Sequence, residues 1–110
     1  MYHLSVKAHS RSNGASATAA AAYRSGQSIT DERTGQTHDY TRRAGVVSTG
    51  IIGWHGSRES LWNAAENAER RSNSTVAREY EIALPADTTD DDRKSMVERF
   101  AAWLADRYGV

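Results

Sequence analysis

The chain has 110 residues, which is enough for one domain with a single modest hydrophobic core. It contains no cysteine, which excludes disulfides, thiolate metal sites and a cysteine nucleophile, and no apolar run approaches the ~18 residues of a membrane-spanning helix. A soluble, cytoplasmic protein without membrane insertion is therefore expected. Basic and acidic residues balance at 14 each, which argues against general coating of DNA.

The charges are distributed unevenly along the chain. Residues 1–55 contain six basic and three acidic residues, whereas residues 56–110 contain eight basic and eleven acidic ones. Twelve of the fourteen basic residues are arginine, whose planar guanidinium suits bidentate contacts with phosphate. Any nucleic-acid site must therefore be local.

The first two elements are predicted by local patterns. Residues 2–9 alternate between apolar and polar side chains, which is typical of a half-buried strand. Residues 10–14 have the composition of a turn, and the alanine-rich run from Ala15 to Ser25 predicts a helix that stops at Gly26. Tyr23 would then lie in the last turn of this helix.

The middle of the chain gives weaker signals. Residues 27–45 are polar and show no sustained period, with a turn at Thr34-Gly35, and residues 46–52 predict a short strand or hairpin arm. Ser57 is a suitable cap for a helix running to about Arg71. The expected inner face of this helix consists of Leu61, Trp62, Ala65 and Ala68.

The last two elements are a strand and a long helix. Residues 76–84 alternate and end before Pro85, with Glu79 and Glu81 sharing one face. Thr88 or Thr89 would cap a helix that ends at Gly109. Its apolar residues recur at helical spacing: Met96, Val97, Phe100, Trp103 and Leu104.

This order of elements predicts an α+β fold. It consists of an antiparallel sheet with helices packed on one face, and the sheet looks incomplete because only two strands are clear. A further strand is expected after Val110. No internal repeat or linker is visible, so residues 1–110 are interpreted as the N-terminal part of a single domain.

Tyr23 is the first candidate for chemistry. Ala19 to Ala22 precede it, and small neighbours let a bulky ligand approach the helix, while the adjacent Arg24 could hold a phosphate. A phenol is a competent nucleophile toward phosphodiesters once it is deprotonated or assisted by a metal. Taken alone, the same pattern also fits a tyrosine that simply covers the apolar face of its helix.

Three strings resemble the opening of the MobA/MobL relaxase family, including the N-terminal part of TraA-like conjugation proteins. They are YHLSVKAHSRSNGASATAAAAYRSG, DERTGQTHDYTRRAGVV and ESLWNAAENAERRSNSTVAREYEIALP, which together span nearly the whole chain in the family's order. The resemblance implies a partial relaxase-type (HUH-like) sandwich with the catalytic tyrosine at Tyr23. It also implies nicking of one strand at a plasmid transfer origin, which leaves a free 3′-hydroxyl and a 5′-phosphotyrosyl link.

The resemblance further implies partners and a metal. The partners would be single-stranded or hairpin DNA at a transfer origin, accessory relaxosome proteins and a coupling protein. The complete family domain carries a three-histidine motif that holds a divalent metal such as Mg²⁺ or Mn²⁺, which would polarise the scissile phosphate. This chain ends before that motif, so no metal ligands or cofactor are assigned to it. Surface or structural roles are preferred for its own histidines, His3, His9, His38 and His55.

The remaining site candidates are acidic and basic residues. Glu79 and Glu81 match acidic residues in the corresponding strand of the family, and they could orient metal ligands or assist the tyrosine proton. A solvated strand face would explain them equally well. The candidates for contacts with DNA phosphates are Lys7, Arg11, Ser12, Arg24, Arg42 and Arg43, with Ser10 as a further donor.

Three functions remain open from the sequence. The first is a relaxase fragment that is inactive, or nearly so, without its histidine strand. The second is a non-catalytic remnant that binds origin DNA, and metal-independent, salt-sensitive binding without a covalent adduct would indicate it. The third is a functionless soluble fragment, because an unpaired sheet edge would favour aggregation.

Overall fold

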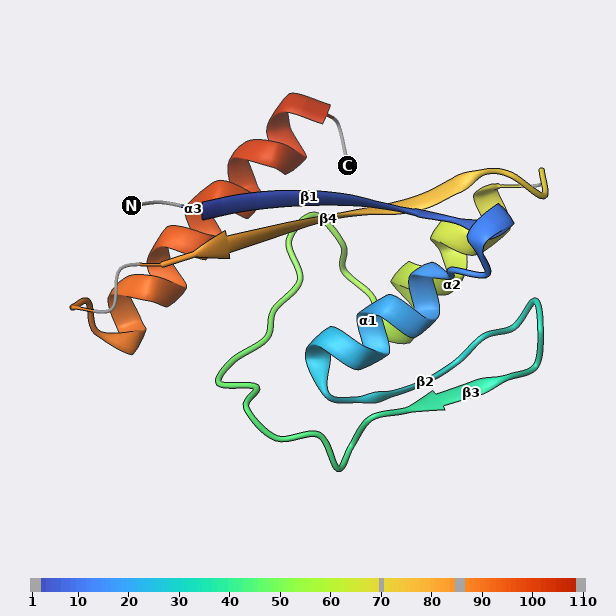
Figure 1. Ribbon diagram of the computed structural model, residues 1–110, viewed down its shortest axis with the longest axis horizontal. Coiled ribbons are helices and arrows are strands. Elements are labelled where there is room, and N and C mark those ends of the chain that lie inside the picture. The colour runs from blue at the N-terminus through green and yellow to red at the C-terminus, as the bar shows by residue number, and fades with distance from the viewer. Residues whose placement is uncertain (1–2, 70, 85–86, 109–110) are drawn as a thin grey trace.

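The computed structural model describes residues 3–69, 71–84 and 87–108 (Figure 1). In chain order the elements are β1 (His3–Ser10), the 3-10 helix η1 (Arg11–Asn13), α1 (Ala17–Ser25), β2 (Ser28–Thr30), β3 (Thr37–Asp39), α2 (Arg58–Ala68), β4 (Thr75–Ala83) and α3 (Asp90–Tyr108). The α+β class predicted from the sequence is confirmed. Among the described residues, none of the helices has the length and apolarity that crossing a membrane requires.

Strands β1 and β4 pair in antiparallel fashion although some 65 residues separate them. Val6 lies opposite Tyr80 and Lys7 lies opposite Glu79. Because successive side chains of a strand point to opposite faces, one face carries Val6 and Tyr80 and the other carries Lys7 and Glu79. Both strands, and the assignment of Glu79 and Glu81 to one face, agree with the sequence analysis.

The helices are distributed over both faces of this strand pair, which refines the predicted single helical layer. Phe100 of α3 meets the ring of Tyr80, with 5.8 Å between ring centroids. Arg24 of α1 instead reaches Glu79 on the opposite face. Hydrophobic periodicity did not reveal this placement, because α1 approaches a polar sheet surface and is joined to it by an ion pair. In Figure 1, α1 and α2 lie side by side, away from α3.

Helix α1 begins two residues later than predicted. Ser16 is its cap, and the Ser16 Oγ accepts a hydrogen bond of 3.1 Å from the backbone N–H of Ala19. Gly14 closes η1 with a φ of 76°, so the chain must first leave that turn before the helix can start. Gly26 ends α1 with a φ of 67°, as the sequence predicted.

A short hairpin formed by β2 and β3 occupies the polar segment where no strands were predicted. Each strand has only three residues and a single inward side chain, such as Ile29, which is too short a pattern for alternation to be recognised. The predicted Thr34-Gly35 turn is confirmed, since Gly35 has a φ of 74° and donates to the carbonyl of Asp31 at 2.7 Å. The predicted strand or hairpin arm at residues 46–52 is wrong, because that segment pairs with no other strand.

Helix α2 is capped by Ser57 as predicted, but its inner face is polar. Asn63 and Glu66 are its buried residues. Of the predicted inner residues, Leu61, Trp62 and Ala65 are half-buried and Ala68 is exposed. The helix ends at Ala68 and not near Arg71. Apolar periodicity therefore missed the most buried side chains of α2, because these are polar and are held by hydrogen bonds.

Glu66 is the most connected of these buried groups. Its side chain is fully buried and accepts hydrogen bonds from the Ala17 N–H at 2.6 Å and from the Arg11 guanidinium at 2.8 Å. Arg11 also donates to the backbone carbonyls of Glu66 and Glu69. The carboxylate thus lies at the N-terminus of α1, where the helix dipole favours a negative charge.

Asp31 and Asn63 attach the hairpin to the helices. The Thr18 hydroxyl donates to the Asp31 carboxylate at 2.6 Å, and Asn63 both accepts from the Glu32 N–H and donates to the Thr30 carbonyl at 2.8 Å. The buried side chains of Thr18, Asp31 and Asn63 are therefore paired, as a buried polar group requires. The apolar part of this core is small and consists of Ala17, Ala22, Ile29 and Val76.

Helix α3 is capped by Thr89, whose hydroxyl accepts from the Asp92 N–H at 3.1 Å. Its apolar residues recur at helical spacing as predicted, but none of its described residues is buried and Trp103 remains 53% exposed. Two strands offer too narrow an apolar face to cover a 19-residue helix. The predicted ends at Pro85 and Gly109 lie outside the described residues.

Replacing Glu66 by alanine should destabilise the fold by about 3–5 kcal/mol, because the largely buried Arg11 would lose its counter-charge. Chemical denaturation of the chain and of Glu66→Ala would measure the change. Glu98→Ala is the matched control, since Glu98 belongs to an exposed pair with Lys94 and should cost about 0.5 kcal/mol or less. Equal losses in the two variants would contradict a structural role for the buried carboxylate.

The stability of the fold should also depend on pH through Asp31. Burial would raise the pKa of Asp31, but hydrogen bonds from Thr18, Thr34 and Arg33 outweigh it and lower the pKa below its ordinary value. Because the folded-state pKa is lowered, the stabilisation is fully present above the unfolded pKa of about 3.9 and disappears as pH falls through the folded value.

Melting temperatures between pH 7 and pH 2 for the chain and for Asp31→Asn would test this dependence. The chain should be more stable than the variant at neutral pH, and the difference should shrink below about pH 4. A difference that stays constant over the whole range would contradict the assignment.

Candidate active site around Tyr23

Tyr23 lies in the last turn of α1 and is 42% exposed. The turn is fixed by the Ser25 hydroxyl, which donates to the Ala21 carbonyl at 2.6 Å, and by Gly26. The ring of Tyr40 meets the Tyr23 ring edge-on, with centroids 5.2 Å apart and an interplanar angle of 88°. The phenol is therefore reachable from solvent while its ring is held from the side.

Two guanidinium groups also contact the Tyr23 ring. The Cζ atom of Arg43 lies 4.2 Å from the ring centroid, and that of Arg24 lies 5.4 Å away. Both distances are within the range of cation–π attraction. Arg43 is placed by a turn in which its N–H donates to the Tyr40 carbonyl at 3.0 Å. Two positive charges thus lie close to the ring of the candidate nucleophile.

Glu79 holds Arg24 in this position. The Nε and Nη2 atoms of Arg24 donate to the two carboxylate oxygens of Glu79 at 2.9 and 2.8 Å, and Nη2 lies 3.5 Å from Glu81. The hydrogen bond from Arg24 lowers the pKa of Glu79, against the opposing effect of burial. The same hydrogen bond raises the pKa of Arg24. Glu79 is therefore ionised at neutral pH and fixes the guanidinium beside Tyr23.

A small cavity of about 270 Å³ opens between α1 and this face of the sheet. Tyr23, Arg24 and Glu79 line it together with Lys7 and His9. The alanines of α1 that face the cavity are small, which leaves this space open. The Nε2 atom of His9 lies 3.6 Å from Glu79, too far for a hydrogen bond but close enough for attraction when the imidazole is charged.

The sequence-predicted residues fall into two groups. Lys7, Arg24, Arg43 and Glu79 gather around Tyr23, and the exposed side chain of Glu81 lies at the edge of this cluster. The others lie elsewhere: Arg11 is engaged by Glu66 with 8% of its side chain exposed, Ser12 is exposed beside Ser10, and Arg42 is exposed without contacting Tyr23.

Sequence reasoning assigned no role in this site to Tyr40 or His9. Tyr40 stands in the string DERTGQTHDYTRRAGVV, but its contact with Tyr23 depends on the β2–β3 hairpin, which was not predicted. His9 shares a face with Lys7 in the predicted strand, and its pairing opposite Ala77 brings it beside Glu79. The sequence alone did not give the register between β1 and β4, which is needed to place His9 beside Glu79.

The described residues do not provide the ligand set of a metal ion. No group of three or more His, Cys, Asp or Glu side chains among them could hold a metal. His9 and Glu79 are neighbours, but both carboxylate oxygens of Glu79 are occupied by Arg24. His38 lies in β3 and His55 in the loop before α2, both apart from this cluster.

Comparison with known proteins shows that this fold is that of a mobilisation protein, with a relaxase-type arrangement of helices and strands. Residues 15–110 match the model of the MobA/MobL family. The chain belongs to the MobA/MobL family. The resemblance identified from the sequence is therefore confirmed.

Several curated proteins are similar to the chain. It is 50% identical to the mobilization protein MobL of Acidithiobacillus ferridurans over the whole of its length. It is 34% identical to a probable mobilization protein MobA of Bifidobacterium longum over 91% of its length. It is 32% identical to the conjugal transfer protein TraA of Agrobacterium fabrum over 89% of its length. The chain spans 30%, 19% and 10% of these relatives, respectively.

One solved structure resembles the chain closely. It comes from work on the molecular basis of vancomycin resistance transfer in Staphylococcus aureus, and it superposes with a TM-score of 0.83 at 33% identity. The match covers 96% of this chain and 57% of that one. The arrangement of helices and strands described above is therefore a shared fold.

The Arg24–Glu79 contact can be tested by titration. In Arg24→Ala the pKa of Glu79 should rise, because the hydrogen bonds that lower it are lost while burial continues to disfavour the charged form. Carboxyl ¹³C chemical shifts against pH would measure the value. Arg42→Ala should leave it unchanged, and an unaltered Glu79 pKa in Arg24→Ala would show that the ion pair does not form in solution.

Proposed function

We propose that residues 1–110 form the N-terminal part of a single relaxase domain and supply Tyr23 as the nucleophile of a DNA-nicking transesterification. The observation that carries the proposal is the 42% exposed Tyr23, whose ring lies within cation–π distance of both Arg24 and Arg43 and which lines the smaller cavity. Membership of the MobA/MobL family supports the reaction class.

The reaction exchanges one phosphate ester for another. The Tyr23 oxygen attacks the phosphorus of a DNA phosphodiester, and the bond between phosphorus and the 3′-oxygen breaks. The phenolic proton is transferred to the departing oxygen through an intervening base, which gives a free 3′-hydroxyl and a 5′-phosphotyrosyl link. The number of phosphate ester bonds is conserved, so the step is reversible and permits rejoining.

The neighbouring residues suit the charge that develops in such a step. Arg24 and Arg43 are positioned to bind the non-bridging oxygens of the attacked phosphate. Glu79 is a positioning residue that orients Arg24, and Glu81 supports the same guanidinium from 3.5 Å. Lys7 extends the positive surface, and the exposed Ser12 and Arg42 would contact phosphates farther along the strand. Arg11 is left out of this surface, because Glu66 engages its guanidinium.

The substrate would be single-stranded or hairpin DNA at a transfer origin, handled in the cytoplasm together with accessory relaxosome proteins and a coupling protein. The family implies a divalent metal, Mg²⁺ or Mn²⁺, that supplies Lewis-acid assistance when bound. The described residues offer no set of ligands for it, so no step is derived through the metal. The chain alone is expected to bind DNA and to nick it too slowly for detection.

A chimera can test the nucleophile, because the MobL relative aligns with the whole of this chain. This chain replaces the matching segment of that relative, and the chimera is incubated with Mg²⁺ and single-stranded DNA from the relative's transfer origin. The DNA is labelled at its 3′-end, since the piece downstream of the nick stays on the protein. A labelled adduct that survives denaturation is expected from the chimera.

Two tyrosine variants give the matched comparison. The adduct should disappear in Tyr23→Phe and persist in Tyr40→Phe, because phenylalanine keeps the ring contact and removes only the hydroxyl. An adduct that survives Tyr23→Phe would assign the chemistry to another residue. Salt-sensitive DNA binding without any adduct in the chimera would instead favour the non-catalytic binding function.

A further inference from the structure

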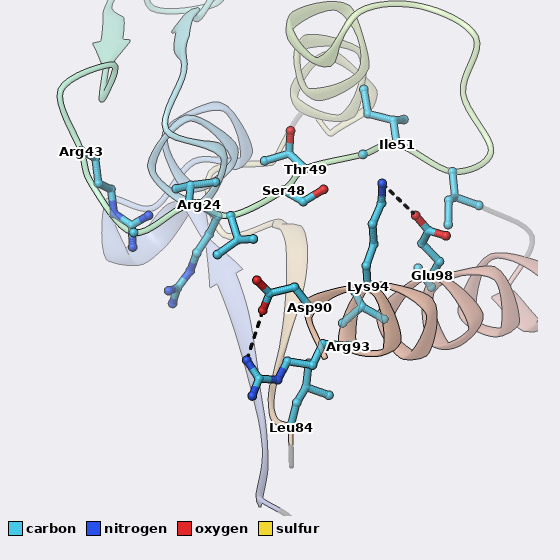
Figure 2. Close-up of a pocket in the computed structure, with 17 residues that line it drawn as sticks. Arg24, Arg43, Ser48, Thr49, Ile51, Leu84, Asp90, Arg93, Lys94 and Glu98 are labelled. Atoms are coloured by element: carbon cyan, nitrogen blue, oxygen red, sulfur yellow. Dashed lines mark hydrogen bonds and ion pairs between the residues drawn. The ribbon is translucent and has the colours of Figure 1, made fainter. Parts of the chain in front are cut away.

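A second and larger cavity lies beside the Tyr23 cluster. It has a volume of about 710 Å³ and separates the segment of residues 45–52 from α3, as Figure 2 shows. Its walls include the apolar side chains of Val46, Ile51, Leu84 and Val97. The volume falls within the range of pockets that hold small organic ligands. The inner surface therefore suits a largely apolar group of that size.

The lining of this cavity has an excess of basic residues, with four basic residues against two acidic ones. Two pairs on α3 balance each other, because Asp90 lies 3.3 Å from Arg93 and Glu98 lies 4.0 Å from Lys94. The excess therefore comes from Arg43 and from Arg24, which is also paired with Glu79 outside the cavity lining. An occupant should therefore combine an apolar body with negative charge.

Arg24 and Arg43 are shared between the two sites. Each lines the larger cavity and also lies against the ring of Tyr23. A phosphate held by these two residues for attack by Tyr23 would thus stand at the mouth of the cavity. The nucleoside attached to that phosphate would then be the part of the DNA nearest to the cavity.

We propose that this cavity is the subsite for the nucleotide adjacent to the scissile phosphate of single-stranded DNA, an inference that rests on the proposed function. The base is unstacked from its neighbours and packs against Ile51 and Val97, while its phosphates contact Arg24 and Arg43. Ser48 and Thr49, which also line the cavity, carry hydroxyls that donate to or accept from a base edge. These two residues would determine base preference at this position.

The test uses thymidine 3′,5′-bisphosphate as the probe and the 110-residue chain carrying Tyr23→Phe, which cannot form an adduct. Methyl ¹³C spectra of the isoleucine and valine residues report occupation of the cavity. Saturable shifts of Ile51 and Val97 are expected. The abasic deoxyribose 3′,5′-bisphosphate has the same phosphates without a base and should leave these methyl signals in place.

Two substitutions in α3 provide the matched pair. Val97→Trp fills the cavity and should weaken binding of thymidine bisphosphate at least ~10-fold, because the apolar contacts of one base are lost. Met96→Trp adds the same side chain at the neighbouring exposed position, which does not line the cavity, and should change affinity less than about twofold. Both variants should keep the melting temperature of the chain.

The outcomes separate this inference from the proposed nucleophile. Equal binding of the two bisphosphates, or binding unaffected by Val97→Trp, would overturn the subsite, even if the chimera forms its Tyr23 adduct. Methyl shifts with the expected dependence on Val97, together with no adduct from the chimera, would support the cavity as a nucleotide site and reject Tyr23 as the nucleophile.

Discussion

The buried carboxylate of Glu66 is the interaction on which the arrangement of the first half of the chain depends. It joins Arg11 at the end of β1 to the backbone of Ala17 at the start of α1, and it comes from the last part of α2. Three elements thus meet at one side chain in a core with few apolar residues. Because the direction of α1 is set at this end, the carboxylate also decides where Tyr23 lies at the other end.

Local signals in the sequence were sufficient for the elements that have strong patterns. Alternation predicted β1 and β4, and the caps at Ser57 and Gly26 were read directly from residue type. The buried side of α2 could not be predicted in the same way, because a glutamate on a helix normally indicates a solvated face. Its burial depends on Arg11, 55 residues earlier, and such a pairing leaves no periodic trace.

In the candidate site, too, local patterns were predicted from the sequence and contacts between distant residues were not. Resemblance to the family pointed to Tyr23, and alternation placed Glu79 on a polar strand face. Neither indicated that Arg24 of α1 would form an ion pair with Glu79 on that face. Arg42 and Arg43 are neighbours of identical chemistry, yet only Arg43 contacts the Tyr23 ring. The turn that begins at Tyr40 makes this distinction, and its position follows from a hairpin whose strands are too short to be recognised in the sequence.

The bidentate contact between Arg24 and Glu79 means that a phosphate would enter a site where the guanidinium already has an anionic partner. Its arrival would exchange one charge-assisted pair for another, so the net free energy gained from Arg24 is the difference between two similar interactions. An arginine held in this way adds little net binding free energy for a phosphate, and correspondingly little free energy is lost when the phosphate leaves. A strand could therefore be exchanged or released without a high barrier, which suits the reversible transesterification proposed above.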